Sequence, residues 1–132
     1  MEKFKQFVDL GTAISMKKLG FKEPCLAFYG FNEKKNHLSI RNNKWHEHKG
    51  MNIRYCHCAT WGQAERWLLK QKYWVQVEYH SYEDLPFGYL FYINRVCVLV
   101  IDKYKNQIDA RQAGIKDLIT RLSNIKSFER WK

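Results

Sequence analysis

The sequence has little proline or glycine and no long apolar run. It contains only 2 prolines and 7 glycines in 132 residues, which excludes an architecture built on Pro/Gly-rich linkers. No apolar segment approaches the roughly 20 residues that a membrane-spanning helix needs. The first residues also lack the apolar segment of a secretory signal. We therefore expect a cytoplasmic protein without membrane association.

The glycine-rich motifs that hold nucleotide phosphates are also missing, so we expect no cofactor. The cysteines are Cys25, Cys56, Cys58 and Cys97. In a chain of this length, rich in core-forming residues, they are expected to be reduced thiols. Cys97 lies in the most apolar run and is expected to be buried. Cys25, next to Pro24, is the better candidate for exposure.

Apolar and aromatic residues, by contrast, are abundant. They make up 45% and 16% of the chain, as expected of a folded protein, and the length fits a single domain over residues 1–132. The 5 Trp, 8 Tyr and 8 Phe exceed what a core of this size needs. Because aromatic residues are enriched at interfaces, this favours a homodimer or a surface for a protein partner. Trp61, Trp74 and Trp131 are expected to be the least buried.

Capping residues predict three helices. Gly20 ends a first helix, which we expect to begin near Thr12. Thr60 opens a second helix in a capping-box pattern, followed by an apolar face. Asn106 caps a third helix over residues 107–123, where Gly114 predicts close packing against another element.

Short β-prone runs separate these helices. They cover residues 25–31, 37–41, 53–58, 75–79, 87–93 and 96–101. Asn94 and Arg95 predict a two-residue hairpin turn between the last two runs. Because both runs are apolar on both faces, we expect this hairpin at the centre of the sheet. The predicted class is α+β, a two-layer sandwich with a largely antiparallel sheet and helices packed mainly on one face.

Three segments resemble a family of small uncharacterised bacterial proteins that phages and other mobile elements often encode. They are residues 13–25, with the ending Leu-Gly-Phe-Lys-Glu-Pro-Cys, residues 60–77, and residues 106–122, with Ala-Arg-Gln-Ala-Gly-Ile. The segments occur in the family's order and cover about a third of the chain. Because the family has no assigned activity, the resemblance implies a fold and a phage or mobile-element context only. The basic segment 34–54 is longer and more charged than the family pattern.

That segment is the candidate nucleic-acid site. The chain carries a net charge of +10, and this segment combines basic residues with an aromatic one. Basic side chains neutralise phosphates and aromatic rings stack on unpaired bases. The candidate residues are Lys34, Lys35, Arg41, Lys44, Trp45, Lys49 and Arg54. Basic positions on the second helix, such as Arg66, Lys70 and Lys72, would extend this surface.

Two enzymatic alternatives involve cysteine. The pairs His46/His48 and Cys56/Cys58 supply zinc-type ligands, but their spacing differs from the usual two to four intervening residues. A thiol nucleophile near Cys25 or Cys56 lacks any local signature. The sequence favours a non-enzymatic accessory protein that acts by protein–protein interaction, with nucleic-acid binding as the alternative and thiol- or metal-dependent catalysis third.

Overall fold

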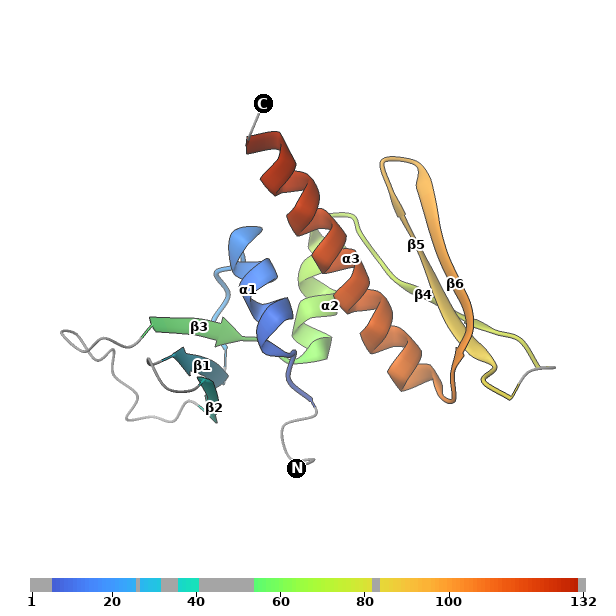
Figure 1. The fold of residues 1–132 in the computed structure, drawn as a ribbon, viewed down its shortest axis with the longest axis horizontal. Helices are drawn as coiled ribbons and strands as arrows, with labels where there is room; N and C mark the ends of the chain where they lie inside the picture. Colours follow the sequence, from blue (N-terminus) through green and yellow to red (C-terminus); the bar gives the residue numbers. More distant parts are fainter. Residues whose placement is uncertain (1–5, 26, 32–35, 41–53, 82–83, 131–132) are drawn as a thin grey trace. The chain divides into compact units, whose positions relative to one another are not determined.

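A computed structural model describes residues 6–25, 27–31, 36–40, 54–81 and 84–130 (Figure 1). Its helices are α1 (Leu10–Lys18), α2 (Trp61–Lys70) and α3 (Gln107–Arg130). Its strands are β1 (Ala27–Phe31), β2 (Asn36–Ile40), β3 (Arg54–Cys58), β4 (Gln76–Tyr79), β5 (Phe87–Ile93) and β6 (Val96–Tyr104). These elements belong to two compact units, Met1–Gly62 and Gln63–Lys132.

In the first unit, α1 begins earlier than predicted. Asp9 is its N-cap, and the Asp9 carboxylate accepts a hydrogen bond of 3.2 Å from the backbone N–H of Thr12. Thr12 therefore lies inside the helix, where it is buried, and the helix begins two residues before the expected start near Thr12. The reason is that two capping residues stand three positions apart, and the earlier one has the free N–H groups within reach.

The end of α1 follows the prediction. Gly20 has a φ of +94°, a left-handed conformation that costs glycine little. Its N–H donates to the Lys17 carbonyl at 3.0 Å, and the N–H of Phe21 donates to the Met16 carbonyl at 3.0 Å. This pair of bonds is the Schellman arrangement, which satisfies carbonyls that the helix end leaves open.

Beside α1 lies an antiparallel sheet with the strand order β2-β1-β3. The strand β3 is the one that contacts α1. At its end, Cys58 is fully buried and its thiol donates to the Val8 carbonyl at 3.2 Å. The backbone N–H of Val8 in turn donates to the Ala59 carbonyl at 2.9 Å. These bonds fasten the chain before α1 to the end of β3.

The second unit contains α3 and a second antiparallel sheet, with the order β4-β5-β6. Asn94 and Arg95 form the tight turn between β5 and β6, with φ values of 50° and 70°. Positive φ at both positions is the type I′ geometry that fits the twist of paired strands. The two-residue hairpin is therefore confirmed.

The hairpin, however, does not lie wholly at the centre of its sheet. The strand β5 is central, whereas β6 is an edge strand. Five of the nine residues of β6 are exposed, against a single exposed residue, Tyr92, in β5. The expectation that both strands are central was wrong for β6. Apolar residues occur on both faces of a strand when the strand is buried. They also occur when one face stays exposed as a surface that another molecule can cover.

The helix α3 packs against β4, β5 and β6. Asn106 caps it as predicted, since the Asn106 Oδ1 accepts from the Asp109 N–H at 2.8 Å. Its buried face consists of Ala110, Gly114, Ile115, Leu118 and Ile119. On α2, the predicted apolar face is confirmed, because Ala64, Trp67 and Leu68 are its buried residues.

Helices packed against antiparallel sheets confirm the α+β class. The described strands form two three-stranded sheets. The single domain over residues 1–132 stays a prediction.

Candidate functional site

The sheet of the second unit has one face covered by α3 and one face without a helix against it in the described part of that unit. Tyr89 and Phe91 of β5 are 5% and 1% exposed and belong to the covered face, because the Tyr89 hydroxyl reaches α3. Successive side chains of a strand point to opposite faces. Leu90 and Tyr92 therefore lie on the other face of the sheet.

The strand register extends this second face across the sheet. Leu90 is paired with Gln76 on one side and Leu99 on the other, and Tyr92 is paired with Cys97. Residues directly opposite each other in antiparallel strands share a face. We call this surface the outer face. It consists of Gln76, Glu78, Leu90, Tyr92, Cys97, Leu99, Ile101 and Lys103.

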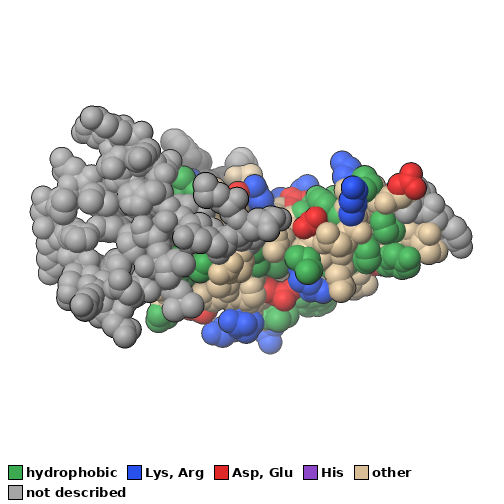
Figure 2. Space-filling model, turned by 90° about the horizontal axis from the view of Figure 1, so that it is seen from below, with side chains coloured by type: hydrophobic (Ala, Val, Ile, Leu, Met, Phe, Trp, Pro, Cys, Tyr) green, Lys and Arg blue, Asp and Glu red, His purple; other side chains and the backbone are tan. Residues whose placement is uncertain are grey.

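The middle of the outer face is apolar and open to solvent. Tyr92, Leu99 and Ile101 are 53%, 54% and 45% exposed, and Cys97 beside them is also exposed. Single exposed apolar residues are ordinary, whereas a contiguous exposed group is a candidate binding surface. In Figure 2 hydrophobic side chains, in green, are interspersed with Lys and Arg in blue and Asp and Glu in red over the described part of the face in view.

Charged residues stand at the two margins of the outer face. Glu78 lies on β4, where its carboxylate accepts a hydrogen bond of 3.0 Å from the Gln76 side chain. Lys103 lies on β6 and is exposed. Between them is Gly88, which is buried and has no side chain. The outer face thus has an acidic margin on β4 and a basic margin on β6.

A bulge sets the position of Lys103. Tyr89 pairs with Val100 and Phe87 pairs with Tyr104, so the register shifts between them. Within the shifted segment Asp102 has a φ of 57°, as the extra residue of a bulge often does. The ring of Tyr104 lies 6.2 Å from that of Tyr89 on the covered face. Lys103, directly before Tyr104, therefore belongs to the outer face.

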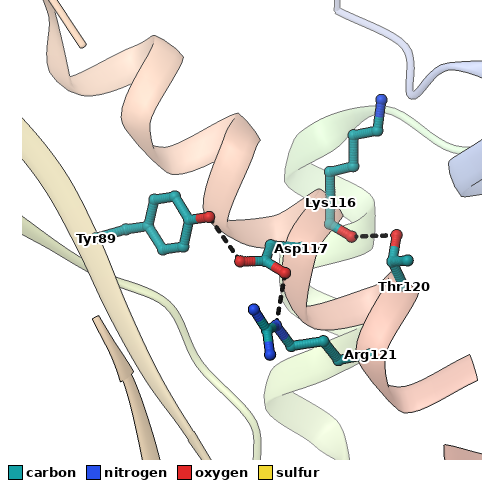
Figure 3. A network of polar contacts seen from close by, with 5 residues as sticks. All are labelled: Tyr89, Lys116, Asp117, Thr120 and Arg121. Atoms are coloured by element: carbon teal, nitrogen blue, oxygen red, sulfur yellow. Dashed lines mark hydrogen bonds and ion pairs between the residues drawn. The ribbon is translucent and has the colours of Figure 1, made fainter. Parts of the chain in front are cut away.

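A network of polar contacts on the covered face fixes the sheet against α3 (Figure 3). The Tyr89 hydroxyl donates to the Asp117 carboxylate at 2.6 Å, and Arg121 donates to the other oxygen of that carboxylate at 2.7 Å. Burial, followed by the hydrogen bond to Asp117, raises the pKa of Tyr89 well above its usual range. At neutral pH this tyrosine is a neutral donor and not a catalytic base.

Gly114 of α3 makes the close approach of helix and sheet possible. A Cβ atom at this position would collide with Cγ1 of Val75 and would lie 3.0 Å from Cγ of Tyr89. The expectation that Gly114 marks close packing is confirmed. Because α3 occupies the covered face so tightly, the outer face is the side of this sheet that is available to a partner.

The structure reverses the expected exposure of two cysteines. Cys97 is exposed and Cys25 is buried, so both expectations were wrong. Cys97 is exposed because it points to the outer face of an edge strand. The Cys25 thiol donates to the Glu23 carbonyl at 3.4 Å, which places it inward at the turn after α1.

The predicted nucleic-acid residues fall outside the described part of the chain. Lys34, Lys35, Arg41, Lys44, Trp45 and Lys49 are not described, and of Arg54 only its backbone, at the start of β3, is described. The basic positions suggested on and after α2, Arg66, Lys70 and Lys72, are exposed. Nucleic-acid binding stays a prediction.

Of the four residues suggested as zinc ligands, only Cys58 has a described side chain. His46 and His48 are outside the described residues, and Cys56 is described only by its backbone. Cys58 is buried, with its thiol on the Val8 carbonyl. In the described ranges no group of three or more His, Cys, Asp or Glu residues could hold a metal ion.

Of the tryptophans expected to be least buried, Trp74 is 55% exposed and Trp61 is half-buried, while Trp131 is not described. None of the described helices is both long and apolar enough to cross a bilayer.

Comparison with protein-family models, curated proteins and solved structures finds no match for the chain.

Sequence reasoning did not single out the outer face. The signal was present in β6, whose Cys97, Leu99 and Ile101 alternate with Val96, Val98 and Val100. Val98 and Val100 are half-buried on the covered face, Val96 at the hairpin end of that face is 63% exposed, and the other set lies on the outer face. The packing of α3 on the covered face, a contact between distant segments, distinguishes the two sets.

Proposed function

We propose that this protein acts by protein–protein interaction and that the outer face is its binding surface. The observation that carries the proposal is the exposure of Tyr92, Leu99 and Ile101 on a sheet against whose other face α3 packs. Burying such side chains against a partner releases about 25 cal/mol for each Å² of apolar surface removed from water. The role is non-enzymatic, as the sequence favoured, and the resemblance of three segments adds a phage or mobile-element context.

The outer face has the composition of an interface centre. Its middle is apolar and contains an aromatic residue, Tyr92, while charged residues stand at its margins. Specific interfaces share this plan, with charges depleted in the centre and aromatic residues enriched. The rigid fixation of the sheet by Tyr89, Asp117 and Gly114 supports the proposal further, because a preorganised surface loses little entropy on binding.

Photo-crosslinking tests the proposal. A benzoylphenylalanine residue in place of Leu99 should give an adduct of discrete mass in cells that express the protein. The matched control carries the same residue in place of Ile108, which is 63% exposed but belongs to α3. An additional Ile101→Lys substitution should abolish the Leu99 adduct. Equal labelling from both positions, or no adduct from Leu99, would contradict the proposal.

A further inference from the structure

We infer that the outer face binds a second copy of this chain, with the two outer faces packed against each other around a two-fold axis parallel to the strands. The inference rests on the proposed function and identifies its partner. The arrangement is a symmetric β-sandwich, in which two sheets pack about 10 Å apart. A two-fold axis requires a surface that is complementary to itself, and the outer face satisfies this requirement.

The first reason is charge complementarity between the two margins. Glu78 is paired with Gly88 across the sheet. On the other side of β5, Val100 is paired with Tyr89 and Tyr104 is paired with Phe87. Lys103 lies between Val100 and Tyr104, so it stands beside Gly88, on the side away from Glu78. Rotation about an axis parallel to the strands places β4 of one copy over β6 of the other. Glu78 then faces Lys103 of the second copy, and the contact occurs twice.

The second reason is the match of the apolar centres. Leu90 lies on the central strand β5, so the axis brings Leu90 of the two copies together. Leu99 and Gln76 flank it at the same level of the sheet, and each packs over the other in the second copy. Tyr92 extends the apolar contact along the axis. Ile101 directly follows Val100, which is paired with Tyr89, so Ile101 also lies beside Gly88 and packs next to the contact between Glu78 and Lys103.

The size of the surface sets the strength of the association. The strands β4, β5 and β6 have four, seven and nine residues, which give roughly 300 Å² per face at about 3.3 Å per residue and about 4.8 Å between strands. Two such faces bury on the order of 600 Å², less than the roughly 1,000 Å² of a stable specific interface. The dimer is therefore weak and reversible, and we expect it only toward high micromolar concentrations.

An alternative way to use this sheet is pairing of the edge strand β6 with a second β6. Two features oppose it. The bulge at Asp102, with its φ of 57°, interrupts the regular row of backbone groups, and Lys103 adds a charge next to it. Bulges and lysines are the usual protection of an edge strand. Pairing of two β6 strands would also leave Glu78, which lies on β4 at the opposite edge of the sheet, without a contact to the second copy.

Sedimentation equilibrium of the purified full chain, at loading concentrations from about 1 to 500 μM, tests the inference. Glu78→Lys and Lys103→Glu should each weaken dimerisation about 10-fold, because each creates two like-charge contacts. The double variant Glu78→Lys/Lys103→Glu should restore the wild-type dissociation constant. Leu99→Lys should weaken the dimer by at least about 100-fold, since it places two charges in the apolar centre. Ile108→Lys, on α3, should have no effect.

A chain that is monomeric at every concentration overturns the inference. So does a dimer that Glu78→Lys leaves unchanged, which is the result expected of edge pairing, and so does a double variant as weak as the single ones. The proposed function is judged separately by the mass of the Leu99 crosslink. An adduct with twice the chain mass supports the second copy, whereas an adduct of another mass retains protein–protein interaction and overturns only the inference. Circular dichroism of each variant shows whether it is folded.

Discussion

The Tyr89 hydroxyl donates a hydrogen bond of 2.6 Å to the Asp117 carboxylate. This bond connects the central strand β5 to α3 and holds the two layers of the second unit together. A hydrogen bond to a charged acceptor contributes about 1.5–3 kcal/mol when it is shielded from water. The Asp117 side chain is 22% exposed, so the contribution should lie toward the lower end of that range.

Tyr89→Phe should therefore lower the free energy of unfolding by about 1–2 kcal/mol. The matched control is Tyr92→Phe, three residues further along the same strand, because the Tyr92 side chain is 53% exposed. Urea denaturation followed by circular dichroism measures both. Equal stability of the two variants would show that the bond to Asp117 contributes nothing.

The raised pKa of Tyr89 predicts a loss of stability in alkali. In the unfolded chain this tyrosine ionises near pH 10, whereas in the folded chain burial and Asp117 keep it protonated to higher pH. Above pH 10 the unfolded state therefore binds fewer protons than the folded state, and the free energy of unfolding falls as the pH rises. Tyr89→Phe should flatten this decline. Urea denaturation between pH 8 and about 11 measures it, and an unchanged slope in the variant would contradict the assignment.

Two glycines in helices should respond to alanine in opposite directions. At Gly114 a Cβ would collide with Val75 and lie 3.0 Å from Tyr89, so Gly114→Ala should destabilise by about 1–3 kcal/mol through overpacking. At Gly11 of α1 no atom lies within 4 Å of the added Cβ. Gly11→Ala should therefore stabilise by up to about 1 kcal/mol, because alanine is the better helix former. Thermal unfolding of the two variants compares them, and stabilisation by both would show that α3 can move away from the sheet.

The three cysteines whose burial is described should differ in reactivity. Cys97 lies exposed on the outer face, while Cys25 and Cys58 are buried. A maleimide applied to the native protein should label Cys97 fast and the other two only when the protein opens, because reaction needs an accessible thiolate. Peptide mapping by mass spectrometry follows each site. Rapid labelling of Cys58 would mean that its bond to the Val8 carbonyl is not maintained in solution.

Local signals in the sequence predicted the ends and turns of the elements well. Gly20 ends α1, Asn106 begins α3, and Asn94 with Arg95 makes the hairpin, because each depends on contacts within a few residues. The start of α1 was missed because Asp9 and Thr12 are both good caps. Sequence alone does not decide which of two neighbouring caps has the free N–H groups within reach.

The outer face was not predicted, for a different physical reason. An apolar residue in a strand looks the same in the sequence whether its side chain packs against a helix of its own chain or is exposed on a surface for another molecule. Cys97 and Val98 are neighbours in one apolar run, yet Cys97 is exposed and Val98 is half-buried. What separates them is the face of the sheet, because Val98 is paired with Phe91 on the covered face and Cys97 is paired with Tyr92 on the outer face. Which face a helix covers depends on contacts between distant segments, and periodicity does not contain that information.

The two faces of the sheet should contribute very differently to folding. Phe91 of β5 is 1% exposed and packs on the covered face, so Phe91→Ala should cost about 3–5 kcal/mol through lost burial and a cavity. Leu99 is 54% exposed, and Leu99→Ala should change the stability of the dilute protein by less than about 0.5 kcal/mol. Urea denaturation at about 1 μM protein, below the concentration expected for association, separates these effects. A large cost for Leu99→Ala under these conditions would mean that this side chain is already covered within one chain, and the outer face would then have no apolar centre to offer a partner.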